Sequence, residues 1–355
     1  MRKISVITTG GTIGSYLAKD LVWLDSAELQ ISNEINKVKE KLGCEIVTDS
    51  ALNKHSEDIF PSDWAKILSS IKAANDSDSD GVIVTHGTDS LSFTVAAALC
   101  FRNMWTKKIC FTGAYYAPNH PNSDAQLNLA ASLEFVLNSN SSYKNGVFVA
   151  FRADGENKQA RIIRGESLKP MNYDDEYFKS AYNEKVADYL LGNDASGTSI
   201  VFSENVCESK NPCLDSDKLP QADSIKLACS KVAMITLYPG IDKKFLAAAI
   251  AGREILIIQA YHCGTGPVFD SDLLSFIQES SSSVKILFGT FPQKYLKVPY
   301  ESTEKLKNAG TFIYADVQAY FLYVFAVLGL SVGLTPDKLI DKLSPYQIPN
   351  KFLSL

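Results

Sequence analysis

The sequence predicts an α/β fold in two domains, the larger one built on a mostly parallel β-sheet flanked by helices. Short, nearly continuous apolar runs end in Gly, Thr or Asp, which is typical of parallel strands buried on both faces. The clearest runs are Ile4–Thr8, Val82–Thr85, Ile109–Thr112 and Val147–Phe151. Patterns with helical periodicity lie between them. The length of 355 residues also exceeds what one hydrophobic core usually covers.

Three helices are expected between the strands of the first domain. Their apolar patterns cover Ser62–Ile71, which follows Pro61, then Phe93–Trp105 and Asp124–Leu137. A proline at the first turn favours a helix start there. Because strands that alternate with helices bind ligands at their carboxyl ends, the residues after each strand are the first candidates for a site.

A polar, proline-bearing stretch, Glu208–Gln221, marks a break in this pattern. We therefore predict a larger α/β domain over 1–205, a linker over 206–229 and a smaller α/β domain over 230–355. The elements expected in the smaller domain are the strands Val232–Leu237, Ile255–Gln259 and Val284–Phe288, a helix near Leu273–Gln278 and an apolar helix near 317–328.

The composition argues against several classes of protein. Hydrophobic residues make up 46% of the chain, and 35 Lys and Arg against 40 Asp and Glu give a net charge of −5. These proportions argue against a disordered chain and against a dedicated nucleic-acid binder, which usually carries a basic patch. The longest apolar stretch, Ala319–Leu334, falls short of the roughly 20 residues of a membrane-spanning helix. No nucleic-acid or membrane partner is expected.

The cysteines, histidines and first residues bear on the compartment. Seven cysteines without a Cys-x-x-Cys pair fit neither a disulfide framework nor a zinc knuckle. The four histidines show no His-x-x-x-His spacing, so no metal site is expected. The start, Met1–Ile7, leads into Thr and Gly rather than into the apolar run of a secretory signal. We predict a cytoplasmic protein.

A glycine-rich turn, Thr9-Gly10-Gly11-Thr12-Ile13-Gly14, directly follows the first predicted strand. Glycines there let the backbone approach a ligand and aim N–H groups at it. A phosphate loop or a plain tight turn also uses such residues. However, a Walker loop needs Lys-Ser/Thr after its last glycine, and the dinucleotide spacing Gly-x-Gly-x-x-Gly is not met. The distinctive group is the hydroxyl of Thr12 among backbone donors.

A second turn, Val84-Thr85-His86-Gly87-Thr88-Asp89-Ser90, ends another predicted strand. Thr88 or Asp89 alone could simply cap the following helix. Together, two threonines, a carboxylate and two glycine-rich turns suit acyl transfer. A threonine hydroxyl needs a base to become a nucleophile, and the tetrahedral intermediate needs backbone donors.

These two segments resemble the bacterial-type L-asparaginase family. The resemblance covers most of the chain, since it extends to Ser56–Trp64, Thr112–Ala114, Ser123–Asp124 with Asn128, Tyr238–Gly240 and Gly264–Pro267. The run Asp89–Thr94 and the missing signal peptide look more like the cytoplasmic, type I branch. The resemblance implies the two-domain asparaginase-like fold.

An L-asparaginase hydrolyses L-asparagine to L-aspartate and ammonia through an acyl-threonine, and the resemblance implies this activity without a metal or cofactor. Thr12 corresponds to the nucleophile, and Thr88 and Asp89 to members of the proton relay. Ser56 and Asp89 would hold the α-carboxylate and α-amino groups of the substrate. The other substrate-binding candidates are Gly11, Glu57, Gly87 and Ala114, the last through its backbone.

The relay lysine has two candidates. In Ala160-Arg161-Ile162-Ile163-Arg164 an arginine stands where the family has lysine, and an arginine stays protonated and cannot shuttle a proton. Lys169 keeps the family's spacing to Phe178-Lys179-Ser180, and a longer hairpin around Asp154–Asn157 would absorb the offset. We predict Lys169, which would favour an ionised carboxylate and ease proton removal from a threonine. Arg164 is the alternative, and a plain surface role for Lys169 also stays open.

Two departures from the family pattern bear on activity. The loop beyond Thr12 reads Lys19–Leu24 without the family's tyrosine. Ala260–Gly264 carries His262 where small residues are usual, and we expect His262 to be packed or to lie at an interface. These departures leave open a related amidohydrolase that acts on glutamine or another amide, or a catalytically impaired asparagine- or aspartate-binding homologue. For the amide-hydrolysing subunit of a transfer-RNA amidotransferase, 355 residues leave little room for a partner-binding domain.

The resemblance also implies assembly. Family members form homodimers or homotetramers, the latter as dimers of dimers, in which the smaller domain completes the site of a neighbour. The expected partners are therefore further copies of this chain and the small-molecule substrate L-asparagine.

Overall fold

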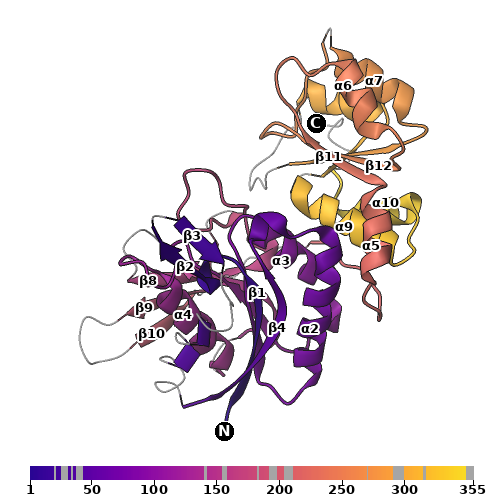
Figure 1. The fold of residues 1–355 in the computed structure, drawn as a ribbon. Helices are drawn as coiled ribbons and strands as arrows, with labels where there is room; N and C mark the ends of the chain where they lie inside the picture. The colour runs from indigo at the N-terminus through magenta and orange to yellow at the C-terminus, as the bar shows by residue number, and fades with distance from the viewer. Residues whose placement is uncertain are drawn as a thin grey trace. The chain divides into compact units, whose positions relative to one another are not determined.

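The chain divides in its computed structural model into two compact units, Met1–Lys210 and Asn211–Leu355 (Figure 1). Each unit has its own β-sheet and hydrophobic core, as expected for a chain of this length. The residues that the structure describes are 1–19, 21–24, 31–32, 35–36, 43–139, 142–153, 158–181, 184–191, 198–203, 211–269, 271–290, 300–314 and 317–348.

An eight-stranded sheet forms the centre of the first unit. In chain order its strands are β1 Lys3–Gly10, β4 Glu45–Lys54, β5 Gly81–Thr85, β6 Lys108–Thr112, β7 Gly146–Arg152, β8 Gln159–Arg164, β9 Ala187–Leu191 and β10 Thr198–Phe202. Their order across the sheet is β10-β9-β8-β7-β6-β5-β1-β4. Strands β4, β1, β5, β6 and β7 are parallel, whereas β8, β9 and β10 each run antiparallel to their neighbours.

Helices cover both faces of this sheet. On one face α4, Ala125–Leu137, shares a hydrophobic core with alternate strand residues such as Ile83 and Cys110. The residues between them in each strand point to the other face. There α2, Trp64–Asp76, packs against β1, β4 and β5, and α3, Leu91–Cys100, packs against α2 and β7. Helix α3 is buried along nearly its whole length, as its unbroken apolar sequence requires.

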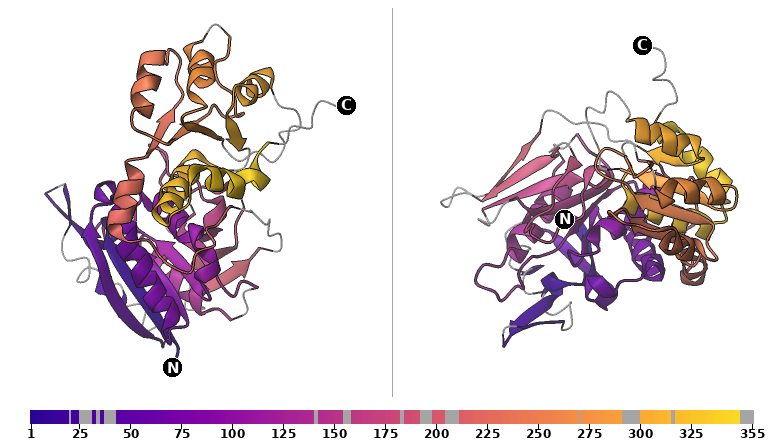
Figure 2. Two further views of the ribbon diagram at one scale, coloured as in Figure 1. Left: turned by 90° about the vertical axis from the view of Figure 1, so that its right-hand side faces the viewer. Right: turned by 90° about the horizontal axis from the view of Figure 1, so that it is seen from above.

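The second unit holds a four-stranded parallel sheet in sequential order, β11-β12-β13-β14. The strands are β11 Val232–Thr236, β12 Ile255–Gln259, β13 Lys285–Gly289 and β14 Phe312–Tyr314. The helices are α5 Ala222–Cys229, α6 Lys243–Ile250, α7 Asp272–Ser280, α8 Glu301–Asn308, α9 Ala319–Ser331 and α10 Pro336–Leu343. Helices α6 and α7 lie on one face of this sheet and α5 and α9 on the other (Figures 1 and 2).

The predicted α/β class is confirmed, and the strands predicted from apolar runs are present as β1, β5, β6, β7, β11, β12 and β13. Strand β4 was not predicted, because this edge strand exposes a polar run, Thr48–Ser50, and carries no continuous apolar signal. The antiparallel strands β8, β9 and β10 were not predicted either. Antiparallel strands that keep one face partly in solvent alternate polar and apolar residues and give a weaker signal than buried parallel strands.

Two predicted boundaries are corrected by the structure. Residues 222–229 of the predicted linker form α5, which packs against α9 through its buried Ile225 and Ala228. Three of its other six side chains are polar and none of the six is buried, so the segment carries only a weak helical apolar pattern. The linker residues 206–210 lie outside the described residues. The predicted helix Phe93–Trp105 ends earlier, at Cys100, where a short 3-10 turn begins at Arg102.

The apolar helix near the C-terminus is α9, and it has 13 residues. Within the ranges that the structure describes, no helix combines the length and the apolar character needed to cross a bilayer.

Candidate active site

The strand order of the first unit reverses at β1. From β1 the chain passes to β4 on one side, and from β5 it proceeds through β6 and β7 on the other. The connections that leave the neighbouring strands β1 and β5 therefore diverge, and α/β proteins bind ligands outside the carboxyl ends of strands at such a reversal. The Thr12 turn follows β1 and the Thr88 turn follows β5, so both lie at this edge.

The two glycine-rich turns are in direct backbone contact. A Cβ atom on Gly11 would lie 2.3 Å from the amide nitrogen of Gly87, and one on Gly87 would lie 2.6 Å from Ser56 Oγ. Gly11 also has a φ angle of 75°, and its N–H donates to the Lys54 carbonyl at 2.9 Å. Only glycine meets these demands. The contact brings together the turns that follow β4, β1 and β5.

Ser56 and Asp89 are joined by two hydrogen bonds. Ser56 Oγ donates to Asp89 Oδ2 at 3.3 Å and accepts from the Asp89 N–H at 3.2 Å. In addition, Ser90 Oγ donates to the Ser56 carbonyl at 2.6 Å. Ser56 is 3% exposed, whereas Asp89 and Glu57 are exposed. The structure thus brings the first two candidates together and leaves Glu57 facing solvent.

The loop after β6 is held at the same edge. A Cβ atom on Gly113 would lie 2.4 Å from the His86 carbonyl oxygen, so this loop packs directly on the β5 turn. The buried carboxylate of Asp124 accepts the Tyr115 N–H at 2.9 Å. The buried Ala114 lies between these two anchored residues, so its backbone is fixed from both sides.

Thr12 and Thr88 are half-buried and carry unused hydrogen-bonding groups. Across the described part of the chain, neither hydroxyl and neither backbone N–H of these two residues has an intramolecular partner. Neither hydroxyl is among the buried side-chain atoms, so both can be reached by a ligand at the strand reversal, where α/β proteins bind their ligands. These groups are two hydroxyls and two backbone N–H donors, the kinds of group that acyl transfer through a threonine would use.

The alternative relay residue, Arg164, lies far from this edge. Strand β8 runs antiparallel to β7 and places Arg164 opposite Phe148, near the amino end of β7. There its guanidinium pairs with Glu166 at 3.1 Å and lies 5.7 Å from the Tyr143 ring centroid. Its position and its ion pair argue against a role beside Thr88.

Lys169 lies closer to the carboxyl edge. Its N–H donates to the Lys179 carbonyl at 2.9 Å, and the adjoining Phe178 packs edge-to-face on Phe151 near the end of β7, with ring centroids 5.1 Å apart. The Lys169 side chain is half-buried and makes no hydrogen bond or ion pair within the residues described. Because the structure does not join it to Thr88, its role stays a prediction.

Arg152, at the carboxyl end of β7, was not among the residues predicted from the sequence. This side chain is only 1% exposed, pairs with Glu176 at 2.6 Å and places its guanidinium 4.8 Å from the Tyr115 ring centroid. It thereby ties the segment that follows Lys169 to the loop that follows β6. The available signal was an arginine at the end of an otherwise apolar strand, since arginine is almost never buried unless it is paired.

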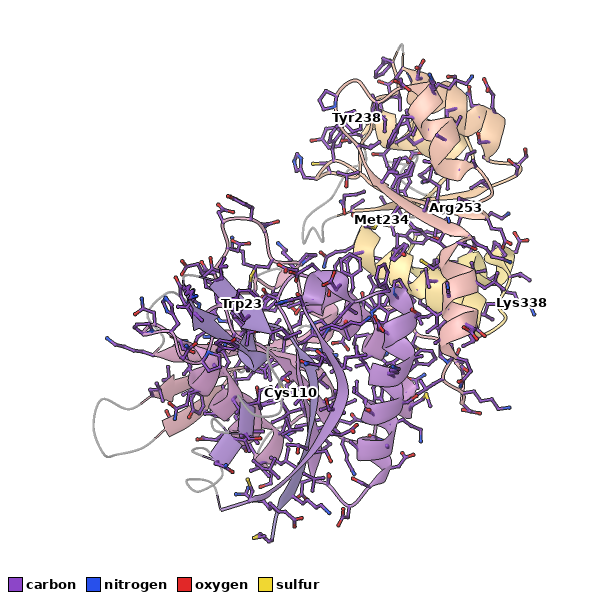
Figure 3. All side chains as sticks on the ribbon, viewed as in Figure 1. Trp23, Cys110, Met234, Tyr238, Arg253 and Lys338 are labelled. Carbon is purple, nitrogen blue, oxygen red and sulfur yellow. The ribbon has the colours of Figure 1, made fainter. Side chains whose placement is uncertain are left out.

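A hairpin follows the Thr12 turn directly; its strands are β2 Ser15–Ala18 and β3 Leu21–Leu24. Asn119, on the loop after β6, accepts the Leu17 N–H at 2.7 Å and donates to the Leu17 carbonyl at 2.9 Å. Trp23 stands opposite Tyr16 across the hairpin and is half exposed (Figure 3). Of these two residues, Trp23 lies in the segment Lys19–Leu24, in which the sequence lacks the family's loop tyrosine.

The groups gathered at this edge are hydroxyls, one carboxylate and backbone N–H groups. Within the described ranges, no cluster of three or more His, Cys, Asp or Glu side chains could hold a metal ion. Burial raises the pKa of the Cys110 thiol to about 12, so this cysteine stays protonated and unreactive. In the second unit, His262 is exposed on the loop after β12, so the expectation that it is packed is wrong. An interface role for His262 stays a prediction.

Fold and site define a two-unit α/β protein with threonine-bearing glycine turns at a strand reversal. The family described as "Asparaginase, N-terminal" matches residues 3–196, more than half of the chain. The chain belongs to the asparaginase family, which confirms the resemblance inferred from its motifs.

Relatives from three organisms illustrate the range of similarity. An L-asparaginase of Thermococcus kodakarensis is 26% identical over 288 residues, covering 81% of this chain and 80% of that protein. A solved structure of the thermostable L-asparaginase from that organism aligns with 96% of each chain at a TM-score of 0.73 and 22% identity. A glutamyl-tRNA(Gln) amidotransferase subunit of Methanococcus vannielii is 24% identical over 338 residues, covering 91% of this chain and 73% of that protein. A probable cytoplasmic L-asparaginase from Campylobacter jejuni aligns with 97% of this chain and 99% of its own at a TM-score of 0.73 and 19% identity.

Proposed function

We infer that this protein hydrolyses the side-chain amide of L-asparagine to L-aspartate and ammonia. The observation that carries this proposal is the backbone contact of Gly11 with Gly87, which gathers the Thr12 and Thr88 turns, each with an unpaired hydroxyl, at the β1–β5 reversal. Membership of the asparaginase family supports an amide as the substrate.

In the proposed reaction Thr12 Oγ attacks the amide carbon, and the tetrahedral intermediate collapses to an ester as the nitrogen takes up a proton and leaves as ammonia. Water then adds to the ester carbon, releases L-aspartate and restores the hydroxyl. The N–H groups of Thr12 and Thr88 would bind the negative oxygen of both intermediates. The proton of Thr12 would pass through a relay of Thr88, Asp89 and Lys169.

The remaining groups would hold the two charged ends of the substrate. The exposed carboxylate of Asp89 suits an ammonium group, and the hydroxyl of Ser56 can turn from Asp89 to a bound carboxylate. Gly87 keeps Ser56 close to the β5 turn because it has no side chain. Exposed Glu57 would lie at the rim, where it can contact the substrate only from the solvent side.

The same proposal assigns the protein to the cytoplasm and to a homodimer or homotetramer whose second unit completes a neighbour's site. The name of the Campylobacter neighbour supports the compartment. Among the strands that the structure describes, those of the second unit show no reversal in their order, which fits a supporting role rather than a site of its own.

A second candidate is amide hydrolysis as one subunit of a transfer-RNA-dependent amidotransferase. The observation that favours it is the similarity to the amidotransferase subunit of Methanococcus vannielii, which covers 91% of this chain. In that case L-asparagine would be turned over poorly without a partner protein.

The deciding experiment measures steady-state ammonia release by the purified chain from L-asparagine and from L-glutamine, with Thr12→Ala as the matched control. We expect asparagine to be hydrolysed by the wild type only. An acid-quenched reaction should show the mass of an aspartyl group on the peptide that contains Thr12. Ammonia from neither amide, together with calorimetric binding of aspartate, would sink the enzyme proposal in favour of a binding protein.

A further inference from the structure

His86 occupies the centre of the turns that form the candidate site. It is fully buried at the end of β5, and its N–H donates to the Thr112 carbonyl at 2.8 Å. Cβ atoms on Gly11 and Gly113 would come within 3.0 Å of its carbonyl carbon and 2.4 Å of its carbonyl oxygen, respectively. The turns after β1 and β6 therefore both pack on the backbone of this one residue in the turn after β5.

The imidazole of His86 has a partner on each nitrogen. Nδ1 lies 2.7 Å from the Gly87 carbonyl oxygen, and Nε2 lies 2.9 Å from the hydroxyl oxygen of Thr94, a residue of α3 that is 1% exposed. A carbonyl oxygen can only accept, so Nδ1 must carry a hydrogen. Burial lowers the pKa of His86 to about 4, partly opposed by the bond to the Gly87 carbonyl. In the neutral ring Nε2 is therefore an acceptor, and Thr94 donates to it.

This arrangement fixes the direction of the next peptide unit. In a trans peptide the C=O and N–H point in opposite directions across one plane. A Gly87 carbonyl held toward the imidazole therefore turns the Thr88 N–H away from it. That N–H has no acceptor in the described part of the chain. In the other tautomer the lone pair of Nδ1 would face the Gly87 carbonyl, and the peptide would lose this restraint.

We propose that Thr94 and His86 are a positioning pair: the Thr94 hydroxyl donates to Nε2 and holds the imidazole in place, so that its Nδ1–H keeps the Gly87–Thr88 peptide with its N–H toward the oxygen of the substrate amide. Both side chains are buried and act through the peptide rather than on the substrate. The inference rests on the proposed function for its catalytic consequence, whereas the tautomer itself does not depend on any activity.

The tautomer is read by nuclear magnetic resonance of protein with 15N-labelled histidine, which contains only four imidazoles. The His86 signals are assigned as those that disappear in His86→Gln. If that variant does not fold, they are assigned as those that shift in Thr94→Ser. We expect a protonated Nδ1 and an unprotonated Nε2 at pH 7 and still at pH 5, above the pKa of about 4. A neutral ring protonated on Nε2, or a cationic ring at pH 7, would overturn the proposal.

The catalytic arm compares Thr94→Val, which removes the donor, with Thr94→Ser, which keeps it. Because the Thr88 N–H would bind charge that develops only in the transition state, we expect Thr94→Val to lower kcat about 10- to 100-fold with little change in KM. Thr94→Ser should stay close to the wild type. Thr311→Val is the matched control, since it removes another buried hydroxyl, which donates to the Leu306 carbonyl at 2.9 Å outside the candidate site. A wild-type kcat in Thr94→Val would contradict the positioning role. An inactive wild-type protein would instead contradict the proposed function, and the tautomer measurement would not be affected.

Discussion

The two sheets of this protein end in very different ways at their carboxyl edges. In the first unit the strand order reverses at β1, and the glycine turns after β1 and β5 touch through their backbones. In the second unit the four strands follow each other in sequence. A Cβ atom added to Gly240, in the turn after β11, would meet nothing within 4 Å beyond its chain neighbours, whereas one on Gly264, after β12, would lie 2.9 Å from the Thr290 side chain. The two units therefore differ in strand order, and the first sheet brings two glycine-rich turns into backbone contact at a reversal, the place where α/β proteins bind ligands.

The largest expected effect comes from removing the threonine hydroxyls. Thr12→Ala and Thr88→Val should each lower kcat by about a thousand-fold or more, because a nucleophile or its relay partner is lost. The thermal midpoint should hardly change, since neither hydroxyl has a partner within the described chain. Thr236→Val, at the exposed carboxyl end of β11, is the control and should leave kcat unchanged. Near-normal kcat in Thr12→Ala would contradict a catalytic site at the edge of the first sheet.

The next effect compares Lys169, which lies closer to the carboxyl edge of the first sheet, with Arg164, which lies near the amino end of β7. Lys169→Met should lower kcat about 100-fold through loss of the proton relay. Arg164→Met should leave kcat near the wild type but lower the thermal midpoint, because Glu166, whose side chain is 8% exposed, would lose its ion pair with Arg164. Steady-state kinetics and thermal unfolding on both variants decide the matter. The opposite pattern would assign the relay to Arg164.

A third effect compares two glycines with positive φ. Gly240→Ala should cost only the strain of a left-handed residue, about 1 kcal/mol. Gly11→Ala has similar strain and also places its Cβ 2.3 Å from the Gly87 nitrogen, so a further 1–3 kcal/mol of overpacking is expected, in order of magnitude. Urea unfolding measures both, and ammonia release should be lost only in Gly11→Ala. Equal losses in the free energy of unfolding for Gly11→Ala and Gly240→Ala would mean that the turns of Gly11 and Gly87 can move apart without loss of stability.

The last effect is a pH dependence of stability that belongs to the first unit. Lys108 is 5% exposed, and its ammonium group donates to the Phe135 carbonyl at 3.0 Å and the Asn138 carbonyl at 2.7 Å at the end of α4. Burial lowers its pKa from 10.5 to about 8, with a smaller contribution from the charge of Lys144. Between pH 8 and 10.5 the unfolded chain therefore binds more protons, and the free energy of unfolding rises with pH.

This contribution should vanish in Lys108→Met. The difference between wild type and variant, measured by urea unfolding from about pH 7 to about pH 10.5, should rise by at most about 1.4 kcal/mol per pH unit, the limit for one proton. Parallel curves for the two proteins would show that the Lys108 pKa is not lowered in the folded state.

The sequence revealed the parts of the fold that leave a strong local signal. Strands β5 and β6 are buried at every position, so their apolar runs are unbroken. Strand β4 left no such signal because it lies at the sheet edge and exposes much of its length. Helix α5 leaves a weak signal because only Ile225 and Ala228 of its eight residues are buried.

The same distinction holds for the candidate site. Thr12 and Thr88 stand in glycine-rich turns, and such turns are visible in any short window of sequence. Arg152 was missed because its partner, Glu176, lies 24 residues away and no local pattern joins the two. His86 belongs to the motif after β5, and only the structure shows that its ring bonds to Thr94 of α3.

The sequence alone determined the fold class, the two glycine-rich turns and the threonines they carry, because these depend on buried apolar runs and on backbone shapes that only glycine allows. Only the folded chain shows that the two turns touch and that Arg164 lies near the amino end of β7, away from the glycine turns. It also shows that His86 is held between Gly87 and Thr94. The reason is physical: strand order and register set which distant residues meet, and neither is written in the residues of any single segment.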